Sequence, residues 1–182
     1  MTLGFTTQIK GKQTHFVSKI VIGLYRNKLI SIDKASEILD VPMSQIKSTR
    51  QLSKIHTMRE DIHNRWKPSM LIDFVINNRT KFRKVFAPRL PVISIQKIEI
   101  YRRDDLPTNM HVGEKITLLY TFPKIAGEYR KSFMVKIDDR WLSGGEIAEL
   151  AENDGFDSVS EFFDWFSDDW KGKLIHWTDF KY

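Results

Sequence analysis

Apolar residues recur at helical spacing near the start of the chain. Phe16, Ile20 and Leu24 lie four positions apart, and valines beside them widen the same stripe. A stripe of this kind is typical of a helix with one buried face. We therefore expect a helix from about residue 14 to residue 27. Thr14 suits its N-cap, since a threonine hydroxyl can accept a hydrogen bond from the first turn.

The segment that follows predicts two shorter helices within residues 29–47. Ser31 can cap the first helix, and the sequence after it has apolar residues on one side. Pro42 separates the two, because proline lacks the N–H group that a helix interior needs.

Two further helices are indicated near the end of the chain. The first begins at Ser143 or Gly144 and stops before Gly155, which suits the left-handed residue after a helix. The second begins after Ser158, and Glu161 three residues later has the spacing of a capping box.

Apolar runs and alternating patterns predict the strands. Residues 54–67 are polar and indicate a loop, and residues 77–89 form a basic connection. The predicted strands are 6–9, 71–76, 91–102, 116–122, 133–137 and 174–178. We therefore expect one α+β domain over residues 1–182, with about five or six strands and helices around them.

Composition excludes several classes of protein. The 182 residues are 41% hydrophobic and 29% charged, as in a globular domain, and none is cysteine. Disulfide frameworks, thiolate metal sites and cysteine nucleophiles are therefore excluded. No apolar run approaches the ~20 residues that span a bilayer, so no membrane partner is expected. The first residues lack the pattern of a signal peptide, and a cytoplasmic location is the expectation.

Charge is divided unevenly along the chain. Residues 1–103 carry a net charge of +13, and residues 104–182 carry −7. A basic half suggests an anionic partner, for which nucleic acid is the usual candidate. Two oppositely charged faces on a domain that binds nothing would give the same numbers.

The densest group of reactive side chains lies at residues 54–61. Lys54, His56, Thr57 and Arg59 follow one another here, with two carboxylates behind them. A lysine in a buried site can act as a base, and a threonine beside it can act as a nucleophile. Arginine can hold a phosphate or a carbonyl oxygen. Polar loops are common, however, so the pattern alone is weak support for a site.

Three short motifs in this chain resemble a known family. They are Ile20-Val21-Ile22-Gly23, Lys54-Ile55-His56-Thr57-Met58-Arg59 and Ala151-Glu152-Asn153-Asp154-Gly155-Phe156. The pattern resembles the ASCH family, the activating-signal-cointegrator homology domains of the PUA-like superfamily. The resemblance implies a PUA-like β-barrel with helices outside it and a cleft beside the lysine motif.

The resemblance also implies two functions. The superfamily binds RNA, and compact bacterial relatives are similar to amidohydrolases that remove the acyl group from N4-acetylcytidine. Carried over by motif, the catalytic roles fall on Lys54, Thr57 and Asp154, with Arg59 beside them and His56 lining the cleft.

Two departures from the family pattern stand out. Asp154 occupies the place of a glutamate and is one methylene shorter, and a misplacement near 1 Å can cost catalysis ~100-fold. About thirty residues separate the first two motifs, which lie almost together in compact members. Residues 24–53 are therefore interpreted as a helical insertion, either packed on the barrel or used as a helix-turn-helix that binds DNA.

The connection between residues 79 and 89 has basic residues interleaved with Phe82 and Phe86. Such a pattern suits phosphate contacts and base stacking, and we expect RNA contacts here. The two phenylalanines would alternatively face the core from a short helix. The expected contact residues are Arg79, Lys81, Arg83 and Lys84.

Metal and cofactor signatures are missing from the sequence. None of the five histidines has the spacing of a metal-ligand pair, and no glycine-rich phosphate loop occurs. We expect no metal and no cofactor. Three functions stay open: binding of RNA or a modified nucleoside, amide hydrolysis on an N4-acylated cytosine, and DNA binding through residues 24–53.

Overall fold

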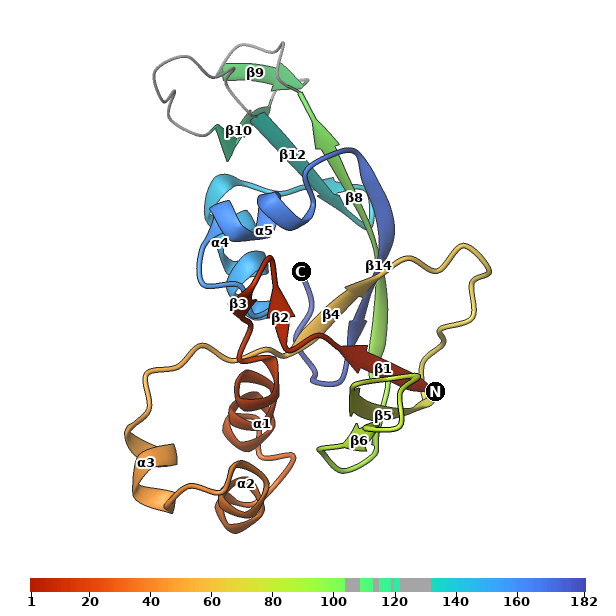
Figure 1. Ribbon diagram of the computed structural model, residues 1–182. Coiled ribbons are helices and arrows are strands. Elements are labelled where there is room, and N and C mark those ends of the chain that lie inside the picture. Colours follow the sequence, from red (N-terminus) through yellow and green to blue (C-terminus); the bar gives the residue numbers. More distant parts are fainter. Residues whose placement is uncertain (104–108, 113–114, 119, 122–131) are drawn as a thin grey trace.

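A computed structural model describes residues 1–103, 109–112, 115–118, 120–121 and 132–182. These residues form a mixed α+β fold (Figure 1). The helices are α1 (Phe16–Arg26), α2 (Ile32–Leu39), α3 (Met43–Ser48), α4 (Gly144–Asn153) and α5 (Val159–Trp165). The strands of four or more residues are β1 (Thr2–Phe5), β4 (His56–Arg59), β5 (Leu71–Ile76), β8 (Ser94–Arg102), β9 (Asn109–Val112), β10 (Lys115–Leu118), β12 (Ser132–Ile137) and β14 (Trp170–His176). The shorter strands are β2 (Gln8–Ile9), β3 (Lys12–Gln13), β6 (Lys84–Val85), β7 (Leu90–Pro91), β11 (Tyr120–Thr121) and β13 (Arg140–Trp141).

The largest sheet has the strand order β11-β12-β8-β14-β4, with β13 paired to β12. Its strands are antiparallel throughout. The long strands β8 and β14 lie in the middle, and β4 forms one edge, where it pairs only with β14 in this sheet. The lysine motif enters the sheet through this edge strand.

A second sheet joins the two ends of the N-terminal half. β1 pairs in parallel with β5, which also pairs with β6 and β7. Neither sheet closes into a barrel within the described residues. The expected α+β class is therefore confirmed, whereas the expected PUA-like barrel is not.

Two hydrophobic cores lie on opposite faces of the large sheet. Leu174 and Ile175 are neighbours in β14, so their side chains point to opposite faces. Leu174 belongs to the core beneath α4 and α5, and Ile175 belongs to the core formed with α1, α2 and the β1–β5 sheet. Both side chains are fully buried. Figure 1 shows the two groups of helices on either side of β4.

Residues 24–53 contain the end of α1 and the helices α2 and α3. Ala35 of α2 and Ile46 of α3 are buried in the same core as α1. Arg26 fastens the following segment to α1 by donating hydrogen bonds to the carbonyl oxygens of Thr49 and Gln51. The segment is therefore packed on the rest of the domain through both of its helices.

Local expectations hold in part. Ser31, Ser143 and Ser158 cap their helices as predicted, and Gly155 has the left-handed backbone with φ +87°. The N-cap of α1 is His15 and not Thr14. The Thr14 hydroxyl still meets the start of the helix, since it accepts a 3.4 Å hydrogen bond from the Phe16 N–H group while it donates to the carbonyl of residue 6.

One predicted loop contains a strand, and one predicted strand reaches beyond the described residues. Residues 54–67 were expected to be a loop, but His56–Arg59 form β4, because pairing with β14 supplies the backbone hydrogen bonds that four mostly polar residues do not signal. The strand expected at 116–122 includes positions 119 and 122, which lie outside the described residues.

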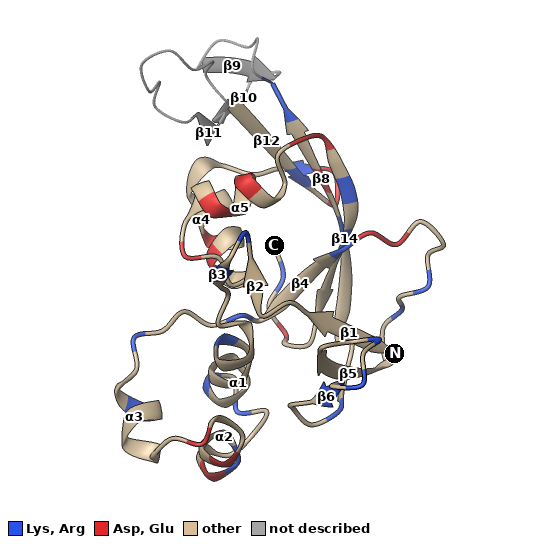
Figure 2. Ribbon diagram, in the orientation of Figure 1, with Lys and Arg blue, Asp and Glu red and all other residues tan. Residues whose placement is uncertain are grey.

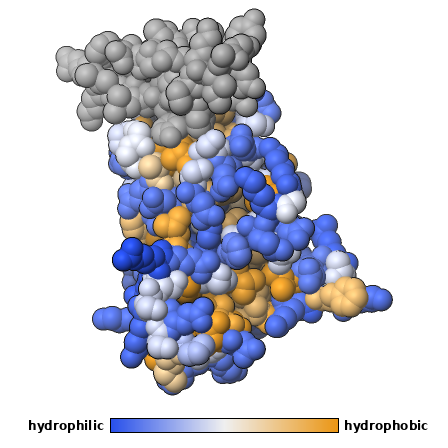
Figure 3. Space-filling model, turned by 60° about the vertical axis from the view of Figure 1, so that its left-hand side comes forward, coloured by the Kyte–Doolittle hydropathy of each residue, from blue (hydrophilic) through white to orange (hydrophobic). Residues whose placement is uncertain are grey.

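On the face drawn in Figure 3, hydrophilic side chains cover the larger part of the described residues, with apolar side chains visible between them. In the described parts of the chain, no helix is long and apolar enough to cross a membrane.

Candidate functional site

The three sequence motifs meet around the backbone of Lys54. Its N–H group donates a 3.0 Å hydrogen bond to the carbonyl oxygen of Lys19 in α1. The N–H group of Ile55 donates another, also of 3.0 Å, to the carbonyl oxygen of Asn153 at the end of α4. Segments that are about 35 and 100 residues away in sequence thus fix the lysine from both sides.

Two glycines make this approach possible. A Cβ atom at Gly23 would lie 2.7 Å from the carbonyl oxygen of Lys54, and one at Gly155 would lie 3.1 Å from Lys54 Cδ. Gly155 also has a positive φ, which other L-residues rarely adopt. The glycines of the first and third motifs therefore surround the lysine backbone and its side-chain stem.

The Lys54 side chain is buried and paired. Only 1% of it is exposed, and its Nζ lies 2.7 Å from Oδ1 of Asp154. The same amine also donates to the backbone carbonyl of Asp154 and lies 4.8 Å from the centre of the Phe16 ring. Burial lowers the pKa of Lys54 to about 8, although the Asp154 charge opposes the shift. A substantial fraction of this lysine is therefore neutral near pH 8.

Asp154 follows the last turn of α4, where its N–H group donates a 2.9 Å hydrogen bond to the carbonyl oxygen of Leu150. Its shorter side chain reaches the lysine, since the helix end is itself held against residue 55. Burial by itself raises the pKa of Asp154, but the Lys54 charge and the adjacent His56 ring lower it below its ordinary value. Glu152, the other carboxylate of the third motif, is exposed.

Thr57 and Arg59 line a small pocket together with Lys54 and Asp154. The pocket has a volume of about 40 Å³, and Phe5 forms part of its wall. Thr57 is 3% exposed, whereas Arg59 donates a 2.6 Å hydrogen bond to the carbonyl of Gly4. The Arg59 guanidinium also lies 5.5 Å from the centre of the Phe5 ring. Base, hydroxyl, carboxylate and guanidinium therefore converge on one pocket.

His56 lies on the other face of β4. Its Nδ1 is 3.5 Å from Oδ1 of Asp154, and its Nε2 is 2.9 Å from the hydroxyl of Tyr182. Burial lowers the pKa of His56, so the ring is neutral at pH 7. The His56 ring, expected to line the cleft, is fully buried and is not among the residues that line the small pocket.

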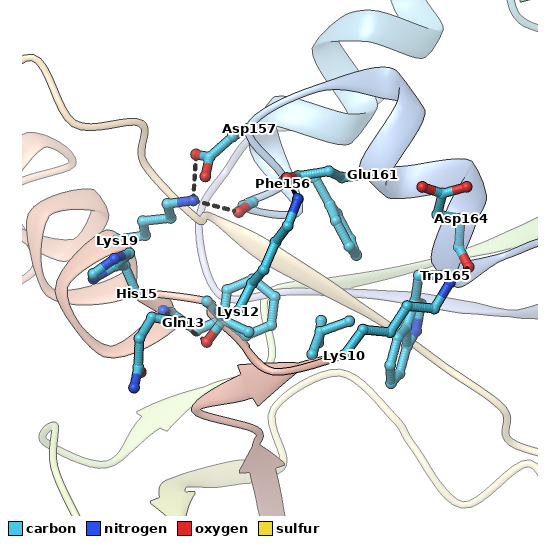
Figure 4. A pocket seen from close by; sticks show the side chains of 14 residues that line it. Lys10, Lys12, Gln13, His15, Lys19, Phe156, Asp157, Glu161, Asp164 and Trp165 are labelled. Atoms are coloured by element: carbon cyan, nitrogen blue, oxygen red, sulfur yellow. Dashed lines mark hydrogen bonds and ion pairs between the residues drawn. The ribbon is translucent and has the colours of Figure 1, made fainter.

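A larger pocket adjoins the first one. It has a volume of about 240 Å³ and lies between the β2–β3 hairpin, the start of α1 and the segment around α5 (Figure 4). The walls shared by the two pockets are Ile9, Phe16, Phe156 and Trp165. The two pockets therefore lie next to each other along these four side chains. Sequence reasoning missed the larger pocket, because its walls come from three distant segments.

Charges around the larger pocket balance. Lys19 is nearly buried and already bound, since its Nζ lies 2.5 Å from Asp157 and 2.9 Å from the carbonyl of Gly155 (Figure 4). Three lysines and three carboxylates line the pocket in all: Lys10, Lys12, Lys19, Asp157, Glu161 and Asp164. Such a lining favours a neutral ligand with polar groups over a polyanion.

The expected RNA-contact residues lie elsewhere, on the loop after β5 and on β6. Arg79, Lys81, Arg83 and Lys84 are exposed, and none of them lines either pocket. Figure 2 shows basic residues along this hairpin and acidic ones on α4 and α5.

The short helix considered for Phe82 and Phe86 does not form. The Phe82 side chain is 67% exposed, with the Lys81 amine 5.1 Å from its ring centre, whereas Phe86 is buried in the core. A turn after β5, held by a hydrogen bond from the Thr80 N–H to the carbonyl of Asn77, directs the two rings apart.

No group of three or more histidine, cysteine, aspartate or glutamate side chains in the described ranges could hold a metal ion. Comparisons of the chain with protein-family models, with curated proteins and with solved structures find no match.

Proposed function

We propose that this protein is an amidohydrolase that removes the acyl group from an N-acylated nucleoside of the N4-acetylcytidine type. One observation carries the proposal: a buried lysine with a pKa lowered to about 8 is paired with a carboxylate at 2.7 Å and shares a pocket with a threonine hydroxyl. A buried lysine whose pKa is shifted by burial and by one specific charge partner, at the wall of a pocket, is typical of a functional site. The resemblance of the three motifs to ASCH domains supports the same assignment.

Each side chain then has a role in the reaction. Neutral Lys54 accepts the Thr57 proton, and Thr57 Oγ attacks the acyl carbon. Lys54 returns the proton to the departing nitrogen as the C–N bond breaks, which leaves an acyl ester on Thr57. Water then hydrolyses this ester and releases the carboxylic acid. Asp154 stabilises the protonated lysine, and Arg59 stabilises charge on the acyl oxygen.

The two pocket volumes suit the two parts of the substrate, the acyl group and the nucleoside. The cavity of about 40 Å³ beside Thr57 has room for a small acyl group, and the adjoining one of about 240 Å³ takes the nucleoside. Trp165 is half exposed at the boundary between the pockets and offers a ring on which a base can stack.

The test is incubation with N4-acetylcytidine, with release of cytidine and acetate as the readout. We expect turnover by the wild type, and its loss in Lys54→Ala and Thr57→Ala. Thr57→Ser keeps a hydroxyl and should retain part of the rate. Lys97→Ala, which removes an exposed lysine on β8, should leave the rate unchanged. Unchanged turnover in Lys54→Ala, or no release from any N-acylated cytosine nucleoside, would overturn the proposal.

RNA binding is a second candidate, carried by Phe82 and the basic side chains around it. An exposed aromatic ring beside lysine and arginine suits a base stacked above bound phosphates. We expect binding of single-stranded RNA to weaken with salt, and the double variant Lys81→Ala/Arg83→Ala to reduce the slope of log K against log salt by about 1.4. The matched control is Lys34→Ala/Lys47→Ala on α2 and α3. An unchanged slope in the Lys81/Arg83 variant would exclude this surface.

A further inference from the structure

The C-terminal segment returns to the site and is fastened there. The Tyr182 N–H donates a 3.0 Å hydrogen bond to Oε1 of Gln96, and Nε2 of Gln96 donates one of 3.1 Å to the Tyr182 carbonyl. These bonds place the Tyr182 hydroxyl 2.9 Å from Nε2 of His56 and 3.1 Å from Nδ2 of Asn153. The tyrosine thus joins the neighbour of Asp154 to the histidine behind its carboxylate.

One tautomer of His56 suits this group best. Nδ1 of His56 is buried 3.5 Å from Oδ1 of Asp154 with no closer partner, and an ionised carboxylate only accepts, so a proton on Nδ1 faces a favourable charge. Nε2 of His56 is then an acceptor, and the Tyr182 hydroxyl donates its hydrogen bond to this nitrogen. The Tyr182 oxygen in turn accepts from Nδ2 of Asn153. Burial raises the pKa of Tyr182, so its hydroxyl keeps the proton that this order requires.

The charged groups near Lys54 come from several elements. Asp154 and His56 approach its amine from the end of α4 and from β4, and Lys19 and Arg59 contribute repulsion from α1 and from further along β4. His176 packs edge-on against His56, with 5.3 Å between ring centres, and burial keeps it neutral by lowering its pKa to about 3. His176 therefore adds no charge. The Asp154 carboxylate is the charged group that the buried His56 and Tyr182 side chains can orient.

We infer that Tyr182 and His56 are positioning residues: the Tyr182 hydroxyl fixes the tautomer of His56, and Nδ1–H of His56 holds the Asp154 carboxylate against Lys54. This inference rests on the proposed function for its effect on rate, but its structural part stands on the contacts alone. Neither residue lines either pocket, so neither touches the substrate. In metal sites, partners that orient a ligand from behind in this way change activity by about 10–100-fold.

The structural part is tested without any substrate. Nitrogen NMR of labelled protein should show His56 protonated at Nδ1 in the wild type and in Tyr101→Phe. The latter is a matched control, because it removes a hydroxyl that bonds to Glu99 away from the site. Tyr182→Phe should populate the Nε2–H tautomer and lower the Lys54 pKa, since a less well oriented carboxylate opposes desolvation less. A wild-type His56 protonated at Nε2 would overturn the inference.

The kinetic part uses N4-acetylcytidine and the same variants. Tyr182→Phe should lower kcat about 10-fold with KM unchanged, and Tyr101→Phe should change neither. His56→Asn keeps an N–H group near the position of Nδ1 and should retain more activity than His56→Ala. Equal losses in the two His56 variants, or a change in KM alone, would contradict positioning. If the wild type shows no turnover but has the predicted tautomer, the proposed function fails and the structural inference survives.

Discussion

Gly23 faces the backbone of Lys54 so closely that a Cβ atom on the glycine would lie 2.7 Å from the lysine carbonyl oxygen. This contact is between two backbones, so neither partner can turn away as a side chain could. It places α1 directly against the segment that leads into β4, where the Lys54 N–H also reaches the carbonyl of Lys19. The position of Lys54 therefore depends on the lack of a side chain at Gly23, which lies in a helix about thirty residues earlier.

Gly23→Ala should consequently destabilise the protein. Alanine ordinarily favours a helix over glycine by up to about 1 kcal/mol. Here the added methyl group must displace a backbone carbonyl, and overpacking of this kind costs about 1–3 kcal/mol. We expect a net loss of unfolding free energy in urea denaturation and a fall in kcat, because Lys54 is displaced.

The control for that substitution is Gly145→Ala in α4. A Cβ atom at position 145 meets nothing within 4 Å, and the residue lies in a helix. Its unfolding free energy should stay constant or rise by up to about 1 kcal/mol. Equal effects of the two substitutions would show that the contact with Lys54 is not tight.

The buried pair of Lys54 and Asp154 should show strong thermodynamic coupling. Lys54→Met leaves the carboxylate buried without its cation, and removal of one partner of a buried pair costs about 3–5 kcal/mol. In the double variant Lys54→Met/Asp154→Asn no unpaired charge remains, so we expect it to be more stable than Lys54→Met alone. Urea denaturation of the wild type, both single variants and the double variant measures the coupling. Additive effects would contradict the pairing.

Stability should depend on pH through Lys54. Its pKa falls from 10.5 when the lysine is solvated to about 8 in the folded protein, so the unfolded chain binds more protons between these values. Stability contributed by this group therefore rises as pH increases from about 8 to about 10.5, by up to ~1.4 kcal/mol per pH unit. The difference in unfolding free energy between wild type and Lys54→Met isolates this effect. A difference that is flat across the window would mean an unperturbed lysine.

The rate of hydrolysis should also depend on the titration of Lys54. Neutral Lys54 is the proposed base, so kcat should rise tenfold per pH unit below pH 8 and level off above it. A profile controlled instead by an ordinary histidine would level off near pH 6.5. Initial rates in a series of buffers of constant ionic strength separate the two cases.

Trp165 should affect substrate binding more than chemistry. Its ring is half exposed and lines both pockets. Trp165→Ala should raise KM several-fold with kcat little changed, because stacking is lost while Lys54 and Thr57 stay in place. Trp141→Ala removes a ring that packs on Tyr101, away from the pockets, and should leave KM unchanged. A fall in kcat alone would place Trp165 in the chemistry instead.

Some features of the site could be predicted from neighbouring residues alone. The two ends of α4 are an example, because Ser143 and Gly155 are local signals, and the structure shows the cap at Ser143 and the left-handed Gly155. The strand at His56–Arg59 could not be predicted in this way. Its four residues are mostly polar, and they are extended because β14 supplies hydrogen-bond partners more than a hundred residues later.

The candidate site residues likewise include some that local sequence indicates and others that only distant contacts bring together. Local spacing singles out Lys54, Thr57 and Arg59 as a reactive group, and the motif adds Asp154. Sequence cannot show that the shorter carboxylate reaches the lysine, since that distance depends on how α4 packs against residue 55. Nor does it connect Tyr182 to the site, because the hydroxyl is placed by Gln96 near the start of β8.

The sequence by itself therefore determined the α+β class, most helix ends and the chemical types present in the site. These properties follow from periodicity, capping and side-chain chemistry, which act over a few residues. Only the tertiary structure decided that the sheet stays open in the described residues, that Lys54 is buried against Asp154, and that two pockets share an aromatic wall. The physical reason is that burial and pairing are properties of contacts between distant segments, and these contacts exist only after the chain has packed.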